Sequence, residues 1–288
     1  MTRVAAFASP ICPESAVCNT VVFVKRALIA LPVLLSLMLS HAIVARAQDE
    51  KTTEDFQRMA AKLAGDREGG EIGQAADAGA PALEEKALES LDAIVLKALN
   101  ADGALDLAVL NKSLTSLVTH ENPTGEDYQV VRLPGAFPVY ALVANFGLAG
   151  PSAVRIYAGP AGHMALAGQI DCYHPEKFFD EYLELVPVAV PEIVFVTVAG
   201  RTDDLQTGIF TAWHFDGQAL HQAWASDLLE QSNYKTDGPN FQLTYCANPD
   251  ENHLGQCLKM VRDTYSYQLG AWKLLETKDL GAAVATPQ

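Results

Sequence analysis

The chain lacks most of the short motifs by which enzymes and nucleotide-binding proteins are recognised. It has no Gly-rich dinucleotide loop, no phosphate-binding lysine loop, no Gly-x-Ser-x-Gly, no His-Glu-x-x-His and no Cys-x-x-Cys. These absences exclude the well-marked catalytic classes, although enzymes without such motifs remain open. We therefore predict no catalytic residue and no resident cofactor, and we favour a protein that is not an enzyme.

Basic residues are also scarce. The chain has 20 Lys and Arg against 35 Asp and Glu, and its formal net charge is −15. Four basic residues and one acidic residue lie in the first 47 positions, so the remainder carries a net charge of −18. Nucleic acids and anionic membranes need basic patches for binding. We therefore expect neither as a partner, and consider a protein, a glycan or a divalent cation instead.

Long apolar runs are limited to one near the start, from Ala27 to Leu39, which is short for a membrane span. It follows Lys25-Arg26 and precedes Ala45-Arg46-Ala47, the charged, apolar and small-residue sections of a secretory signal. We predict a signal peptide over residues 1–47, cleaved after Ala47, and a secreted or periplasmic protein without a membrane span. An uncleaved signal anchor is the alternative.

Cysteine is rare, and three cysteines remain after cleavage: Cys172, Cys246 and Cys257. An odd number outside the cytoplasm predicts one disulfide and one free thiol. Cys246 ends one predicted strand and Cys257 begins the next, so we predict a bond between them, which would stabilise the fold by about 3 kcal/mol. The alternative is a nucleophilic Cys172 beside His174.

The first part of the exported chain is predicted to be helical or flexible. Residues 48–81 are rich in Gly, Ala and acidic residues and predict a flexible acidic linker, with a short helix over Glu54 to Leu63. Residues 82–120 predict a helical hairpin that runs to about Leu99 and resumes at Asp106. At the other end of the chain, residues 281–288 predict a disordered tail.

Residues 121–280 predict a repeated β-meander domain, because strand patterns recur in three sets of four. The predicted strands are Asp127 to Leu133, Val139 to Phe146, Ala153 to Tyr157 and His163 to Ile170; Tyr182 to Val190, Ile193 to Ala199, Gly208 to Phe215 and Gln218 to Ala225; Ser232 to Thr236, Phe241 to Cys246, Cys257 to Tyr267 and Ala271 to Thr277. The fold class predicted is mainly β: three consecutive four-stranded antiparallel meanders, propeller-like or sandwich-like, behind a short helical hairpin. A β-trefoil-like barrel is the alternative.

The middle set has the clearest hairpin. Asp216-Gly217 suits a two-residue type I′ turn, which would place Trp213 opposite Leu220 and Ile209 opposite Trp224. These four apolar residues would then share one core-facing side. In the same register His214 and His221 are diagonal neighbours on the other side, and with a carboxylate they could bind a metal ion.

Three loops join the second and third strands of the meanders and are the main candidate binding site. If the sheets are related by rotation, these loops meet at one end, where binding residues usually lie on a rigid scaffold. The candidate ligand-binding residues are Arg201, Asp203, Asp204, Asn248, Asp250, Glu251 and His253. We predict a non-enzymatic binding protein that uses these loops. A metal-dependent hydrolase centred on His214 and His221 is one alternative, and a structural envelope protein is another.

Overall fold

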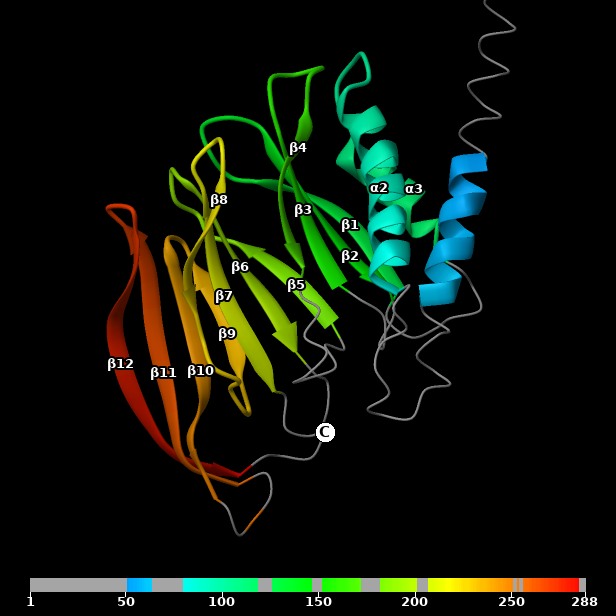
Figure 1. Ribbon diagram of the computed structural model, residues 1–288. Coiled ribbons are helices and arrows are strands. Elements are labelled where there is room, and N and C mark those ends of the chain that lie inside the picture. Colours follow the sequence, from blue (N-terminus) through cyan, green and yellow to red (C-terminus); the bar gives the residue numbers. More distant parts are fainter. Residues whose placement is uncertain are drawn as a thin grey trace, which may run out of the picture. The chain divides into compact units, whose positions relative to one another are not determined.

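The computed structural model describes residues 51–63, 80–118, 126–146, 152–171, 182–200, 207–250, 253 and 256–284. In these ranges, three helical segments precede twelve strands, which form three four-stranded antiparallel sheets (Figure 1). Each sheet has its strands in chain order. The predicted fold class, mainly β with three consecutive meanders behind helices, is confirmed.

The helices begin and end close to the positions that the sequence predicts. Residues 51–63 are helical, α2 spans Ala80–Leu99 and α3 spans Leu107–Thr115. Asp106 caps α3, because its carboxylate accepts hydrogen bonds from the backbone N–H groups of Ala108 and Val109. No helix in the described part of the chain has the length and apolar character that crossing a bilayer requires.

All three helical segments pack on the first sheet. Its strands are β1 (Glu126–Leu133), β2 (Val139–Phe146), β3 (Ser152–Ala158) and β4 (Ala165–Asp171). Phe56 of the first helix is fully buried, and its ring contacts Tyr128 and Phe146 of the sheet edge-on or tilted. Leu88 and Leu91 of α2 belong to the same buried cluster. Burial of one helical face therefore holds this layer on the sheet.

Two asparagines fix the helices against particular strands. Asn100, at the end of α2, donates from Nδ2 to the carbonyl of Met164 and accepts from its N–H at Oδ1. Asn111 of α3 makes the same two bonds with Val130 of β1. Because each asparagine satisfies both a backbone donor and a backbone acceptor, these contacts set the position of the helices along the strands.

The second and third sheets repeat the meander. The second contains β5 (Tyr182–Pro187), β6 (Ile193–Gly200), β7 (Gly208–Phe215) and β8 (Leu220–Ala225). The third contains β9 (Asn233–Asp237), β10 (Asn240–Pro249), β11 (Gln256–Gln268) and β12 (Ala271–Val284).

Each sheet packs on the next one along the chain. Ile193 and Phe195 of β6 lie in a core shared with the first sheet, whereas Val194 and Val196 lie in a core shared with the third. The strand is therefore apolar on both faces, as its sequence indicates. Since the twelve strands form three separate sheets, the β-trefoil alternative is wrong.

The predicted register of the β7–β8 hairpin is wrong. Phe215 pairs with Leu220 and His214 pairs with His221, so the turn is centred on Gly217-Gln218 rather than on Asp216-Gly217. Gly217 has a φ of +100°, which suits the first central position of a type II′ turn. The Asp216 carboxylate accepts from the backbone N–H groups of Gln218 and Ala219, which stabilises this turn.

The two tryptophans of this hairpin lie on opposite faces, not on one face as predicted. Trp213 packs on the core between the first and second sheets, and its Nε1 donates to Thr197 Oγ1 at 2.9 Å. Trp224 packs on the core between the second and third sheets, 4.8 Å from the ring of Tyr265. The cause is a β-bulge between the pairs Ala212–Trp224 and Trp213–Gln222. It leaves one extra residue on β8, so Trp224 lies opposite Ala212 and on the other face of the sheet from Trp213.

Candidate functional site

The three candidate loops leave the sheets at one end, which we call the loop end. Asn145, next to the last residue of β2, donates from Nδ2 to the carbonyl of Leu183 at 3.2 Å. Leu183 pairs with Ala199, next to the last residue of β6. The end of β2 therefore lies beside the start of β5, which pairs with the end of β6. The short turns, including those of β3–β4, β7–β8 and β11–β12 at the top of Figure 1, form the opposite turn end.

Backbone contacts join the loop ends of the second and third sheets. Gly208, the first residue of β7, exchanges two 2.9 Å hydrogen bonds with Leu229, and the next residue, Glu230, accepts from the N–H of Cys246 at 3.0 Å. The predicted disulfide between Cys246 and Cys257 is confirmed, with Cα atoms 5.8 Å apart. The β10–β11 loop is thus closed at its base and linked to the start of β7.

The structure describes only some of the predicted loop residues. Arg201, Asp203, Asp204 and Glu251 lie outside the described residues. Asn248 lies in β10 opposite Lys259. The Oδ2 atom of Asp250 lies 2.9 Å from Nδ1 of His253, and this carboxylate is only 14% exposed while the imidazole is 62% exposed. The structure thus brings Asp250 and His253 together on the third loop.

The histidine pair lies on the β7–β8 hairpin at the turn end. His214 and His221 are directly opposite each other rather than diagonal, with ring centroids 6.3 Å apart. The Nε2 atom of His221 lies 2.9 Å from Oδ2 of Asp216. Among the described residues, no group of three or more His, Cys, Asp or Glu side chains has an arrangement suited to a metal ion.

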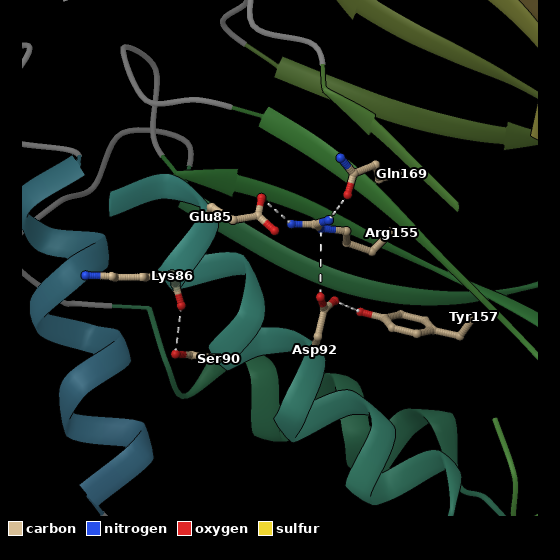
Figure 2. A network of polar contacts seen from close by, with 7 residues as sticks. All are labelled: Glu85, Lys86, Ser90, Asp92, Arg155, Tyr157 and Gln169. Atoms are coloured by element: carbon tan, nitrogen blue, oxygen red, sulfur yellow. Dashed lines mark hydrogen bonds and ion pairs between the residues drawn. The ribbon is translucent and has the colours of Figure 1, made fainter. Parts of the chain in front are cut away.

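A buried charged cluster fastens α2 to the first sheet, as Figure 2 shows. Arg155 of β3 is fully buried, and its guanidinium lies 3.0 Å from Oε2 of Glu85 and 4.0 Å from Oδ2 of Asp92. It also donates to Oε1 of Gln169 on β4. The hydroxyl of Tyr157 donates to Asp92 Oδ1 at 2.6 Å. One buried cation is therefore paired with two carboxylates from the helix.

Burial dominates the electrostatics of this cluster. It raises the pKa of Asp92 above the ordinary 3.8, against the hydrogen bond from Tyr157 and the charge of Arg155, which lower it. Burial and the neighbouring Asp92 carboxylate also raise the pKa of the Tyr157 hydroxyl far above its usual range. Tyr157 is therefore a hydrogen-bond donor at every physiological pH. The cluster's contacts are those of a structural link between layers.

A second buried charge lies in the third sheet. Asp263 of β11 is 5% exposed, and its carboxylate accepts hydrogen bonds from the hydroxyls of Tyr245, Tyr265 and Thr277. Burial, followed by the charge of Asp263, raises the pKa values of both tyrosines. All three hydroxyls therefore stay protonated and donate to the carboxylate.

Comparisons with protein-family models, curated proteins and solved structures find no match for this chain.

Sequence reasoning missed both buried charges, although each left a signal. Arg155 interrupts an otherwise apolar strand, and Asp92 follows Leu88 by one helical turn on an apolar helix face. Asp263 lies in a strand with aromatic neighbours. A lone charge at a buried position indicates a paired group, but only the fold identifies its partner.

Proposed function

We propose that the exported part of the chain is a secreted or periplasmic, non-enzymatic binding protein that contacts its ligand at the loop end. One observation carries the proposal. The Asn145–Leu183 contact joins β2 to β5, and the Gly208–Leu229 and Glu230–Cys246 contacts join β7 and β10 through residues 229–230, so the three sheets are linked to one another at this end. Loops that leave a rigid scaffold side by side are a common arrangement for recognition.

The third loop is the best-supported part of this surface. The Cys246–Cys257 disulfide closes its base, and backbone hydrogen bonds join Asp250 to both His253 and Gln256. These contacts order the described residues of the loop, and a segment that is already ordered loses less conformational entropy when it binds. Its Asp250 and His253 side chains lie in contact, and the imidazole is largely exposed to solvent.

The charges of the candidate residues favour a positively charged ligand. The acidic members are Asp203, Asp204, Asp250 and Glu251, and the basic member is Arg201. A basic protein segment or a cation is complementary to such a set, and we favour these over a neutral glycan.

A thermal-shift screen of the exported protein tests this proposal, because a ligand that binds the native state raises the melting temperature. The panel contains Ca²⁺ and Mg²⁺, which prefer carboxylate oxygens, a lysine-rich peptide and neutral oligosaccharides. We expect the peptide or a cation to raise the melting temperature. The variant D203N/D204N/D250N/E251Q should lose most of this rise.

The matched control neutralises two carboxylates near the short turns, in the variant E192Q/D237N, and should keep the full response. Equal losses in both variants would contradict binding at the loop end. Hydrolysis of an ester, phosphate, peptide or glycoside that His221→Ala abolishes would replace the proposal with the hydrolase alternative.

A further inference from the structure

The β7–β8 hairpin brings two imidazoles together at the turn end, away from the loop end. His214 and His221 are paired across the strands, and their ring planes differ by 29°. Side chains directly opposite in an antiparallel pair have Cβ atoms about 4.5–5.5 Å apart. With ring centroids 6.3 Å apart, the two imidazoles are close enough for one ion to lie about 2.0–2.1 Å from a nitrogen of each ring.

The Asp216 carboxylate orients the imidazole of His221 for metal binding. Its Oδ2 lies 2.9 Å from Nε2 of His221, while its Oδ1 accepts hydrogen bonds from the N–H groups of Gln218 and Ala219. A carboxylate can only accept, so Nε2 carries the proton and the lone pair of Nδ1 is free. Metal-binding histidines commonly donate their second N–H to a carboxylate in this way.

His214 is held by its ring face rather than by its nitrogens. Its ring lies 5.1 Å from that of Tyr267 on β11, and the side chain is half-buried. Within the described ranges, neither of its nitrogens has a hydrogen-bond partner. The stacking contact therefore orients the imidazole and leaves its lone pair unused.

We propose that His214 and His221 together bind one borderline transition-metal ion, such as Cu²⁺ or Zn²⁺, with Asp216 as a positioning residue. Imidazole ligands suit these ions, and Cu²⁺ binds most tightly among the divalent first-row metals. Two protein ligands leave the remaining coordination positions to water or to a ligand from outside the chain. This site is independent of the loop-end proposal, because none of its residues lies in the three loops.

Titration of the untagged protein with Cu²⁺ alone tests the site, by calorimetry for affinity and by electron paramagnetic resonance for the ligands. We expect one Cu²⁺ per chain with coupling to two nitrogens. His221→Ala should weaken binding at least tenfold. His214→Phe should do the same while keeping the ring contact with Tyr267, so its loss of affinity cannot be ascribed to lost packing.

His253→Ala is the matched control. His253 also lies 2.9 Å from an aspartate carboxylate, through Nδ1 rather than Nε2, but it is on the third loop and has no second histidine opposite it among the described residues. This variant should bind Cu²⁺ as the parent protein does. Absence of binding, unchanged affinity in both hairpin variants, or an equal loss in His253→Ala would overturn the proposal.

Asp216→Asn tests the positioning role separately. The amide oxygen still accepts from the turn, but the amide nitrogen would donate to Nε2 of His221 and place the imidazole proton on Nδ1. We expect at least a tenfold loss of Cu²⁺ affinity, an unchanged melting temperature without metal, and a change of His221 tautomer in ¹⁵N NMR spectra. Unchanged Cu²⁺ affinity together with the altered tautomer would contradict this role.

Discussion

Arg155 and Asp263 occupy the third strands of the first and third sheets, and each is a buried charge, but they are compensated differently. The partners of Asp263 are hydroxyls of its own sheet, on β10, β11 and β12. The anionic partners of Arg155 come from α2, 70 and 63 residues earlier in the chain. The third sheet therefore compensates its charge alone, whereas the first sheet depends on the helical layer.

This difference adds Arg155 to the apolar core and the asparagine contacts as a link on which the helices and the first sheet depend. Separation of α2 from the first sheet would either expose the guanidinium to solvent or leave it buried without an anionic partner. A buried charge without partners costs several kcal/mol. Loss of one hydroxyl partner from Asp263 would leave two others in place.

The largest effect is expected for Arg155→Ala. This change leaves the buried carboxylate of Asp92 without its cation and removes packing between β3 and α2. We expect a loss of about 3–5 kcal/mol in the free energy of unfolding, measured by urea denaturation. Arg132→Ala in the same sheet is the control, since this arginine is exposed, and it should cost about 0.5 kcal/mol or less.

An apolar replacement of the whole cluster sharpens the result. The triple variant Arg155→Met, Asp92→Leu and Tyr157→Phe removes the guanidinium, the carboxylate and the hydroxyl together. None of these three groups is then left buried without its partner. We expect it to recover most of the stability that Arg155→Ala loses. A triple variant as unstable as the single one would show that packing, rather than the unpaired charge, accounts for the loss.

A smaller effect is expected for Asp263→Asn. The asparagine keeps one oxygen acceptor, and the side chains of Tyr245 and Thr277 are exposed enough for their hydroxyls to hydrogen-bond to water instead. We expect a loss of about 1–3 kcal/mol, again from urea denaturation. Asp279→Asn, an exposed carboxylate on β12, should be nearly neutral. A loss for Asp263→Asn that matches Arg155→Ala would remove the contrast between the two charges.

The smallest effect concerns pH. Burial raises the pKa of Asp92 in the folded protein, so the folded state takes up a proton more readily than the unfolded chain. This contribution to stability therefore grows as the pH falls from the raised pKa towards about 4. Relative to Asp92→Asn, the parent protein should gain stability over this interval. A relative gain towards higher pH would contradict the assignment of burial as the dominant cause.

Local patterns predicted the strands well because each is bounded by turn residues. Gly217 and Gly270 both adopt the positive φ that their turns need. The Cys246–Cys257 bond was predictable for a similar reason, since both residues flank one short loop. In the helices, the spacing of Leu88, Leu91 and Val95 identified the buried face.

What the sequence could not provide depends on contacts between distant segments or on side chains within turns. The hairpin turn lies one residue later than predicted, where the Asp216 carboxylate accepts from the backbone of the turn. His214 is therefore paired directly with His221. Nothing local connects Glu85 to Arg155, since 70 residues separate them. The Asp250 and His253 contact was also not specified by the loop's composition.

The most direct test follows unfolding by two signals at once. All three tryptophans, Trp213, Trp224 and Trp272, lie in the second and third sheets, so their fluorescence reports on those sheets, while far-UV circular dichroism also reports on the helices. If Arg155 makes the helices and sheets one cooperative unit, the two denaturation curves coincide in the parent protein and separate in Arg155→Ala, with the helical signal lost first. Separate curves in the parent protein would contradict the account.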